Sequence, residues 1–194
     1  MASTAALLIA LLVVALQVHA LQTPGKRVVV FGATGYIGKY VVKESVRRGY
    51  DTGERSRRCL SALTTVVAVV REGSKPRDDF LGGAKIVTSD VTDPASITRD
   101  VFGGPVDVVI SCLASRSGVK KDAFKIDYEA TLNCLDAARK AKASHFILLS
   151  AFCVKKPLLQ FQHAKLKFEK ALVSAGDIKY RCALPVSQYI IMPG

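Results

Sequence analysis

Three glycines spaced three residues apart, Gly32, Gly35 and Gly38, directly follow a short run of mostly β-branched residues. The run 27–31 reads Arg-Val-Val-Val-Phe, which is typical of a strand buried on both faces of a parallel sheet. The first two glycines allow a tight turn and a close approach of the backbone to a pyrophosphate, and the third allows a helix to pack on the strand. The pattern predicts a dinucleotide-binding loop, and the alternative is a glycine-rich turn without a ligand.

An amphipathic segment, residues 40–48, comes directly after these glycines. We therefore expect a helix whose first N–H groups and positive dipole end face the loop, so that phosphate binding requires no lysine there. The cofactor contacts predicted in this loop are Gly32, Thr34, Gly35, Tyr36, Ile37 and Gly38.

The residue after the second predicted strand bears on the choice of cofactor. NAD sites usually place a carboxylate there, which binds the ribose 2′-hydroxyl, whereas this chain has Arg71. A guanidinium binds a 2′-phosphate with paired N–H groups, so Arg71 favours NADPH over NADH. The alternative is an ordinary surface arginine. After the third predicted strand, Asp90 and Val91 are expected at the adenine edge, and the alternative for Asp90 is a turn residue.

Strand-like and helix-like segments alternate along the rest of the chain, which predicts an α/β fold with a doubly wound parallel sheet. Ligands are then expected beyond the carboxyl ends of the strands, where the strand order reverses. We assign residues 26–184 to a single Rossmann domain. The predicted strands are 28–31, 66–70, 85–88, 106–111 and 145–150, and the predicted helices are 36–48, 95–101, 122–143 and 158–175.

The N-terminal residues have a different composition. Residues 5–16 form an uninterrupted apolar run, which is too short for a comfortable membrane span, and Val18-His19-Ala20 fits the pattern before a signal peptidase cut. We predict that residues 1–20 are a signal-type targeting segment. The alternative is a retained membrane anchor, which would hold the domain close to a membrane.

The chain is strongly basic, with 28 lysines and arginines against 16 acidic residues and a net charge of +12. Such a field attracts phosphorylated or acidic ligands. The basic residues fall in separate groups and match no DNA or RNA module, so nucleic acid is not a predicted partner.

The five cysteines are odd in number and have no paired spacing. We predict that they are mostly buried apolar thiols, with Cys112 and Cys153 at the ends of core strands. The three histidines are scattered, so no metal site is predicted.

Five segments together resemble a known family. They are 31–39 (FGATGYIGK), 109–115 (VISCLAS), 126–133 (IDYEATLN), 145–150 (HFILLS) and 155–169 (KKPLLQFQHAKLKFE). The first four resemble atypical short-chain dehydrogenases of the extended, NmrA-like kind. The last, together with 109–115, resembles the 8-vinyl-reductase family of plastid chlorophyll biosynthesis. This resemblance implies NADPH-dependent reduction of the 8-vinyl group of a chlorophyllide or its precursor, a tetrapyrrole pigment, to an ethyl group.

The resemblance also assigns residue roles in the second half of the domain. Ordinary short-chain dehydrogenases carry Tyr-x-x-x-Lys, in which the phenol protonates a ketone oxygen. Here the spacing reads Phe161 to Lys165, so carbonyl reduction by that route is disfavoured, whereas hydride delivery to a C=C bond needs no phenol there. By resemblance, Lys165 is the catalytic residue and binds the nicotinamide ribose, and Leu113 contacts the cofactor. The alternative is that Phe161 and Lys165 are a core residue and a solvated residue one helical turn apart.

Two segments depart from the family pattern. Residues 52–65 interrupt it and look like an insertion, and residues 181–194 diverge where the family continues into a substrate-binding region. We therefore expect an incomplete copy in which the C-terminal substrate region is missing.

These inferences lead to one main functional hypothesis. The chain is expected to be an NADPH-binding Rossmann domain of the vinyl-reductase type, targeted to a plastid through its N-terminal signal, and unable to reduce pigment by itself. Two alternatives are an NADP-binding redox-sensing or assembly protein without catalysis, and another NmrA-like double-bond reductase. The oligomeric state stays open.

Overall fold

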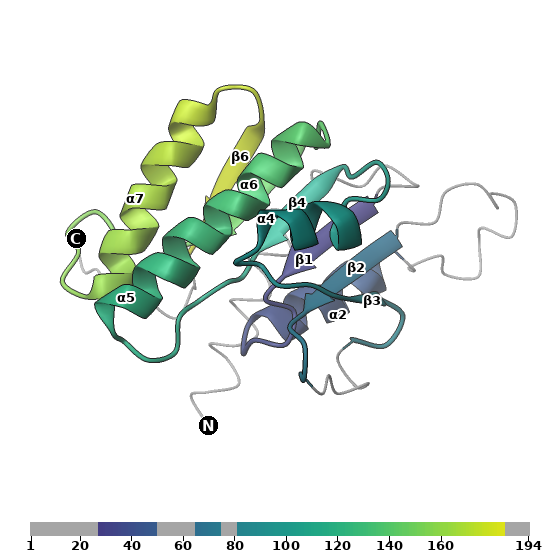
Figure 1. Ribbon diagram of the computed structural model, residues 1–194, viewed down its shortest axis with the longest axis horizontal. Helices are drawn as coiled ribbons and strands as arrows, with labels where there is room; N and C mark the ends of the chain where they lie inside the picture. The colour runs from purple at the N-terminus through teal and green to yellow at the C-terminus, as the bar shows by residue number, and fades with distance from the viewer. Residues whose placement is uncertain (1–26, 50–64, 75–80, 185–194) are drawn as a thin grey trace, which may run out of the picture.

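The structure, a computed structural model, describes residues 27–49, 65–74 and 81–184 (Figure 1). The predicted targeting segment 1–20 and residues 52–64 of the predicted insertion lie outside the described residues. Six parallel strands form one sheet in the order β3-β2-β1-β4-β5-β6, which confirms the doubly wound fold. The strands are β1 (Arg27–Phe31), β2 (Thr65–Val70), β3 (Lys85–Thr88), β4 (Val108–Ser111), β5 (His145–Leu149) and β6 (Lys179–Ala183).

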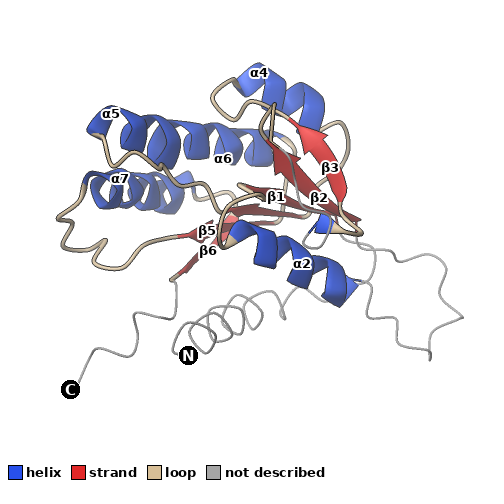
Figure 2. Cartoon of the chain, turned by 90° about the horizontal axis from the view of Figure 1, so that it is seen from below, coloured by secondary structure: helices blue, strands red, loops and turns tan. Residues whose placement is uncertain are grey.

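Helices cover both faces of the sheet (Figure 2). Helix α2 (Gly38–Gly49) lies on one face. The other face carries α4 (Pro94–Ser96) with η1 (Ile97–Val101), the continuous segment of α5 (Lys120–Ala123), η2 (Phe124–Ala130) and α6 (Thr131–Lys140), and α7 (Gln160–Ala175). None of the helices in the described part of the chain is long and apolar enough to cross a membrane.

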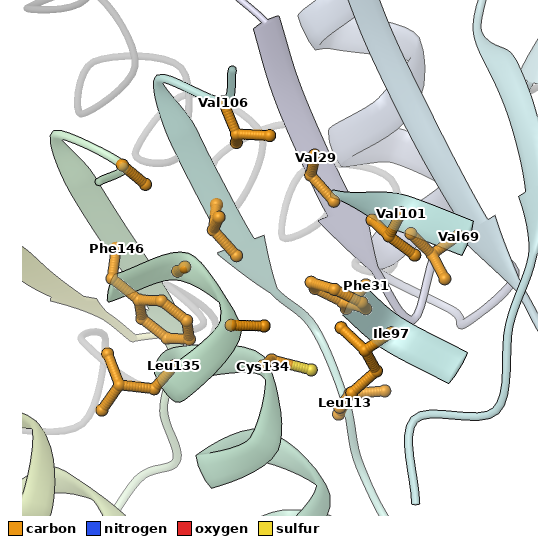
Figure 3. Packing of buried hydrophobic residues seen from close by; sticks show 14 of the residues in the cluster. Val29, Phe31, Val69, Ile97, Val101, Val106, Leu113, Cys134, Leu135 and Phe146 are labelled. Atoms are coloured by element: carbon orange, nitrogen blue, oxygen red, sulfur yellow. The ribbon is translucent and has the colours of Figure 1, made fainter. Parts of the chain in front are cut away.

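Two apolar layers fill the space between the sheet and the helices. Successive residues of a strand point to opposite faces, and β1 shows this directly. Val29 and Phe31 belong to the layer beneath α6 and α7, which Figure 3 shows from close by, whereas Val28 and Val30 pack with residues of α2. All four side chains are buried, as the valine-rich run of the sequence predicts for a strand covered on both faces.

The strand order places several loops at the expected ligand side. It reverses between β1 and β4, because β2 and β3 extend the sheet in one direction and β4, β5 and β6 in the other. Phe31, the last residue of β1, is in register with Val69 of β2 and with Ser111, the last residue of β4. The loops that follow β1, β2 and β4 therefore begin close together.

The structure differs from the sequence-based elements in two places that matter for the site. The predicted helix 122–143 begins at Lys120, ends at Lys140 and contains η2, a π-helical turn that hydrophobic periodicity does not reveal. The strand β6 was not predicted from this sequence. It lies at the edge of the sheet and four of its five residues are exposed, so it lacks the apolar run that marks the central strands.

Candidate dinucleotide site

The glycine loop between β1 and α2 leaves no space for side chains at two of its three glycines. Gly32 has a φ of 73°, and an added Cβ would lie 2.7 Å from the carbonyl oxygen of Cys112 at the end of β4. A Cβ on Gly38 would overlap the Gly32 carbonyl oxygen and lie 2.9 Å from its carbon. The requirement at Gly35 is weaker, since its Cβ would lie 3.1 Å from the same oxygen. The lack of a Cβ at Gly32 therefore lets the loop pack against the end of β4, and its lack at Gly38 lets α2 pack against the loop.

The other three residues predicted in this loop have different environments. Thr34 and Tyr36 are exposed, and the Tyr36 side chain keeps 67% of its surface accessible. Ile37 is partly buried and packs on the apolar layer beneath α2. The loop is closed by a hydrogen bond of 2.9 Å from the Gly35 N–H to the Gly32 carbonyl. The residues of this loop lie at the switch point of the sheet, at the N-terminal end of α2.

Arg71 and Asp90 follow the next two strands of the sheet. Arg71 is the first residue after β2 and is exposed. One carboxylate oxygen of Asp90 accepts from the N–H and the hydroxyl of Thr92, each at 2.8 Å. These two bonds lower the pKa of Asp90 below its usual value, and the positive charges of Lys125 and Arg71 lower it further. Asp90 therefore forms a turn next to two cationic side chains, and its contact with the adenine edge stays a prediction.

Val91 connects this turn to the opposite helix layer. Its carbonyl accepts a hydrogen bond of 3.3 Å from the Asn133 side-chain amide on α6. Residues 90–92 are thereby fixed relative to α6, although 42 positions separate Val91 from Asn133.

Lys165 is buried at the ends of β4 and β5, with only 5% of its surface exposed. Its ammonium donates to the carbonyls of Leu113 and Leu149, both at 3.1 Å, and lies 3.2 Å from a carboxylate oxygen of Asp127. The alternative in which Lys165 is a solvated helix residue is therefore wrong. Phe161, one turn earlier on α7, is partly buried. The structure thus brings Lys165 and Leu113, both predicted site residues, into direct contact.

Asp127 is a site residue that sequence reasoning missed. Its side chain is fully buried, and its second carboxylate oxygen accepts a 3.1 Å hydrogen bond from the Ser115 N–H. A signal was present in the sequence, because Asp127 lies at helical spacing in a row of apolar residues. The other members of this row are Ala123, Ala130 and Cys134, all buried. A carboxylate on the buried stripe of a helix requires a partner, and here that partner is Lys165.

The cysteines in the described residues divide into two groups, and Cys59 lies outside those residues. Cys112 and Cys134 are buried, as predicted, but Cys153 and Cys182 are exposed, which corrects the prediction for these two. Cys153 lies in the loop after β5 with a φ of 55°, and Cys182 lies on the edge strand β6.

Thiol alkylation tests this division. Burial raises the pKa of the Cys112 thiol to about 12 and also raises the pKa of Cys134, so both stay protonated and inaccessible at about pH 8. We expect iodoacetamide to label Cys153 in the native protein and to label Cys112 and Cys134 only after unfolding. Peptide mass spectrometry measures each site, and equal labelling rates for Cys112 and Cys153 would contradict the burial pattern.

A family model for NAD(P)H-binding proteins matches residues 32–175 of the chain. The chain is also similar to proteins named divinyl chlorophyllide a 8-vinyl-reductase, chloroplastic. It is 46% identical to the one from Zea mays over 159 residues and 48% identical to the one from Cucumis sativus over 159 residues. These matches cover 80% and 77% of the chain but only 38% and 35% of the relatives. The chain therefore spans less than two fifths of their length.

Solved structures with the same fold include nucleotide-sugar epimerases. A UDP-galactose 4-epimerase is 21% identical with a TM-score of 0.64, over 80% of this chain and 54% of that one. A UDP-glucose 4-epimerase from Thermotoga maritima is 18% identical with a TM-score of 0.64, over 80% of this chain and 54% of that one. At these identities the likeness concerns the fold alone.

The matched residues 32–175 begin at the first glycine of the loop and end at the last residue of α7, so they contain Arg71, Asp90, Leu113 and Lys165. The match covers most of the chain, and the glycine loop lies at the switch point of the sheet. The chain therefore belongs to the NAD(P)H-binding family.

Proposed function

We propose that this chain is an NADPH-binding domain of the 8-vinyl-reductase type, whose reaction is the NADPH-dependent reduction of the 8-vinyl group of a divinyl chlorophyllide-type pigment to an ethyl group inside a plastid. The similarity to chloroplastic 8-vinyl-reductases supports the substrate and the compartment. The observation that carries the reaction class is Phe161. It occupies the position of the usual phenol donor, one turn before a buried lysine, and its side chain has no proton to give.

The residues of the glycine loop fit a dinucleotide. A Cβ on Gly32 or Gly38 would meet backbone atoms within 3 Å, so these glycines allow the close packing of strand, turn and helix that a dinucleotide-binding loop requires. The Lys39, Tyr40 and Val41 N–H groups in the first turn of α2 donate to the Gly35 and Ile37 carbonyls, so it is the positive dipole end of the helix that suits a pyrophosphate. The loop lies at the sheet position where Rossmann domains bind their cofactors.

The preference for NADPH rests on Arg71. Its exposed side chain leaves the end of β2, where the adenosine ribose is expected, and Lys125 adds positive charge in the same region through its interaction with Asp90. A guanidinium at this position matches a 2′-phosphate with paired N–H groups.

In this proposal each residue of the site has a role in binding NADPH or in the reduction. When bound, NADPH supplies a hydride for one vinyl carbon, and a proton added to the other carbon completes the reduction. Gly32, Gly35 and Gly38 admit the pyrophosphate. Leu113 contacts the nicotinamide half, and Lys165 binds its ribose. Phe161 presents an apolar ring in place of an acid, which suits an alkene better than a ketone.

Arg71→Ala tests the cofactor preference. We expect NADPH binding to weaken about 10- to 100-fold, because charge-assisted bonds to the 2′-phosphate are lost, while weak NADH binding stays unchanged. Calorimetry on the full chain with both cofactors measures the two affinities. Arg181→Ala is the matched control, since it removes an exposed arginine from β6 at the edge of the sheet. Equal weakening by both substitutions would reject a specific role for Arg71.

Pigment reduction is tested separately by incubating the protein with divinyl chlorophyllide and NADPH and separating vinyl from ethyl products by chromatography. Formation of the ethyl product supports the vinyl-reductase reaction and contradicts the expectation that this chain cannot reduce pigment by itself. NADPH binding without pigment reduction matches that expectation, and it equally matches the alternative of an NADP-binding redox-sensing or assembly protein. Reduction of an unrelated C=C substrate instead favours another double-bond reductase.

A further inference from the structure

The continuous helix from Lys120 to Lys140 carries a charge at its most buried position. Asp127 has no exposed surface, and it lies within η2, where the helix widens into a π-helical turn. Burial of an unpaired carboxylate is costly, so a buried acid is retained only with compensating partners. π-Helical turns within α-helices occur frequently at functional sites.

Asp127 holds two parts of the dinucleotide site at once. Its Oδ2 accepts from the Ser115 N–H at 3.1 Å, which anchors the loop after β4. Its Oδ1 lies 3.2 Å from Nζ of Lys165 and, among the described residues, accepts no aligned hydrogen bond, so the ion pair compensates its charge. The same ammonium donates to the carbonyl of Leu113 in that loop.

These contacts form a closed arrangement of three elements. The loop 113–115 donates one N–H to Asp127 and offers one carbonyl to Lys165, and Asp127 and Lys165 are paired with each other. The loop follows β4 at the switch point, next to Gly32, whose Cβ would meet the Cys112 carbonyl. A substitution of the Asp127 carboxylate would therefore alter the positions of both the loop 113–115 and the Lys165 ammonium.

We propose that Asp127 is a positioning residue for Lys165 and the loop 113–115, setting their orientation toward the nicotinamide half of the cofactor. The proposal rests on the proposed NADPH-binding function. Asp127 makes no contact with the cofactor in this role and acts through Lys165. A carboxylate is needed because both hydrogen-bond acceptors of the ammonium are neutral carbonyls, and the charge of Asp127, 3.2 Å away, compensates the buried positive charge.

Asp127→Asn tests the role with two ligands that differ in one half. NADPH contains the nicotinamide ribose, whereas adenosine 2′,5′-bisphosphate lacks it. We expect the dissociation constant of the full chain for NADPH to rise about tenfold, as for a lost charge-assisted contact, and binding of adenosine 2′,5′-bisphosphate to stay unchanged within about twofold. Glu129→Gln is the matched control, because it removes an exposed acid from the same turn. A merely structural role would weaken both ligands together.

A double-substitution cycle tests whether Asp127 acts through Lys165. If it does, the chain carrying both Asp127→Asn and Lys165→Met binds NADPH no more weakly than the chain carrying Lys165→Met alone. Additive losses would overturn the proposal, as would unchanged NADPH binding by Asp127→Asn. Wild-type protein that binds neither ligand would instead reject the proposed NADPH function itself, and the present inference with it.

A measurement on the wild-type chain covers the case in which Asp127→Asn fails to fold. NMR of 15N-labelled lysine side chains detects buried ammonium groups. We expect the Lys165 signal to shift when NADPH is added and to stay in place when adenosine 2′,5′-bisphosphate is added. A Lys165 signal whose chemical shift does not change with either ligand would overturn the proposal.

Discussion

Gly38→Ala is expected to abolish measurable NADPH binding and to lower the free energy of unfolding by about 2–3 kcal/mol. The added methyl group would overlap the Gly32 carbonyl oxygen, and both atoms belong to the backbone of a tightly packed loop. Relief requires α2 to move away from β1, which displaces the positive end of the helix from the phosphate position. A displacement of about 1 Å can reduce the effectiveness of a positioned site roughly 100-fold.

Calorimetry for NADPH and chemical unfolding followed by circular dichroism measure the two effects of Gly38→Ala. Gly103→Ala provides the control, because its Cβ would have only an ordinary contact of 4.0 Å with the Arg99 carbonyl. Gly35→Ala should fall between the two, since its Cβ contact of 3.1 Å needs only a small adjustment. Wild-type affinity in Gly38→Ala would show that α2 does not need this close approach.

Lys165→Met should destabilise the folded protein by about 3–5 kcal/mol, the usual cost of removing one partner of a buried ion pair. The substitution keeps the apolar stem but leaves the Asp127 carboxylate without its compensating charge and two carbonyls without a donor. For a chain of this size the loss corresponds to a fall in melting temperature of roughly 6–20 °C. Thermal unfolding followed by circular dichroism measures it.

Lys170→Met separates the ion pair from the general effect of removing a lysine, because Lys170 is exposed on the same helix. A chain with both Lys165→Met and Asp127→Asn has no buried charge left at this position, so part of the stability should return. A loss below about 1 kcal/mol in Lys165→Met would mean that the pair is solvated in solution and behaves like a surface ion pair.

The glycine loop shows how much of this site could be predicted from the sequence. The β-branched run followed by Gly32, Gly35 and Gly38 predicted a strand, a tight turn and a close helix, and the structure contains all three. This succeeds because each requirement is local. A strand covered on both faces needs an apolar run, a positive φ needs glycine, and a helix that approaches a carbonyl cannot carry a Cβ there.

Lys165 and Asp127 show where local reasoning ends. Lys165 was selected by resemblance, but its burial was not predicted, because a lysine on an amphipathic helix is usually solvated. Asp127 lies 38 positions before Lys165 in the chain, and only the packing of α7 against η2 brings the two together. The exposure of the Cys153 and Cys182 thiols was not predicted for the same reason, because it depends on which distant parts of the chain pack over each residue.

The sequence by itself determined the α/β fold, the position of the dinucleotide loop and most of the elements that carry the site, because these depend on local conformational preferences and on the periodicity of apolar residues. The tertiary structure alone decided that Lys165 is paired with Asp127, that Asn133 of α6 holds the turn at Val91, and that β6 extends the sheet. Such contacts join residues far apart in the chain, and a buried charge reveals its partner only when the elements are packed.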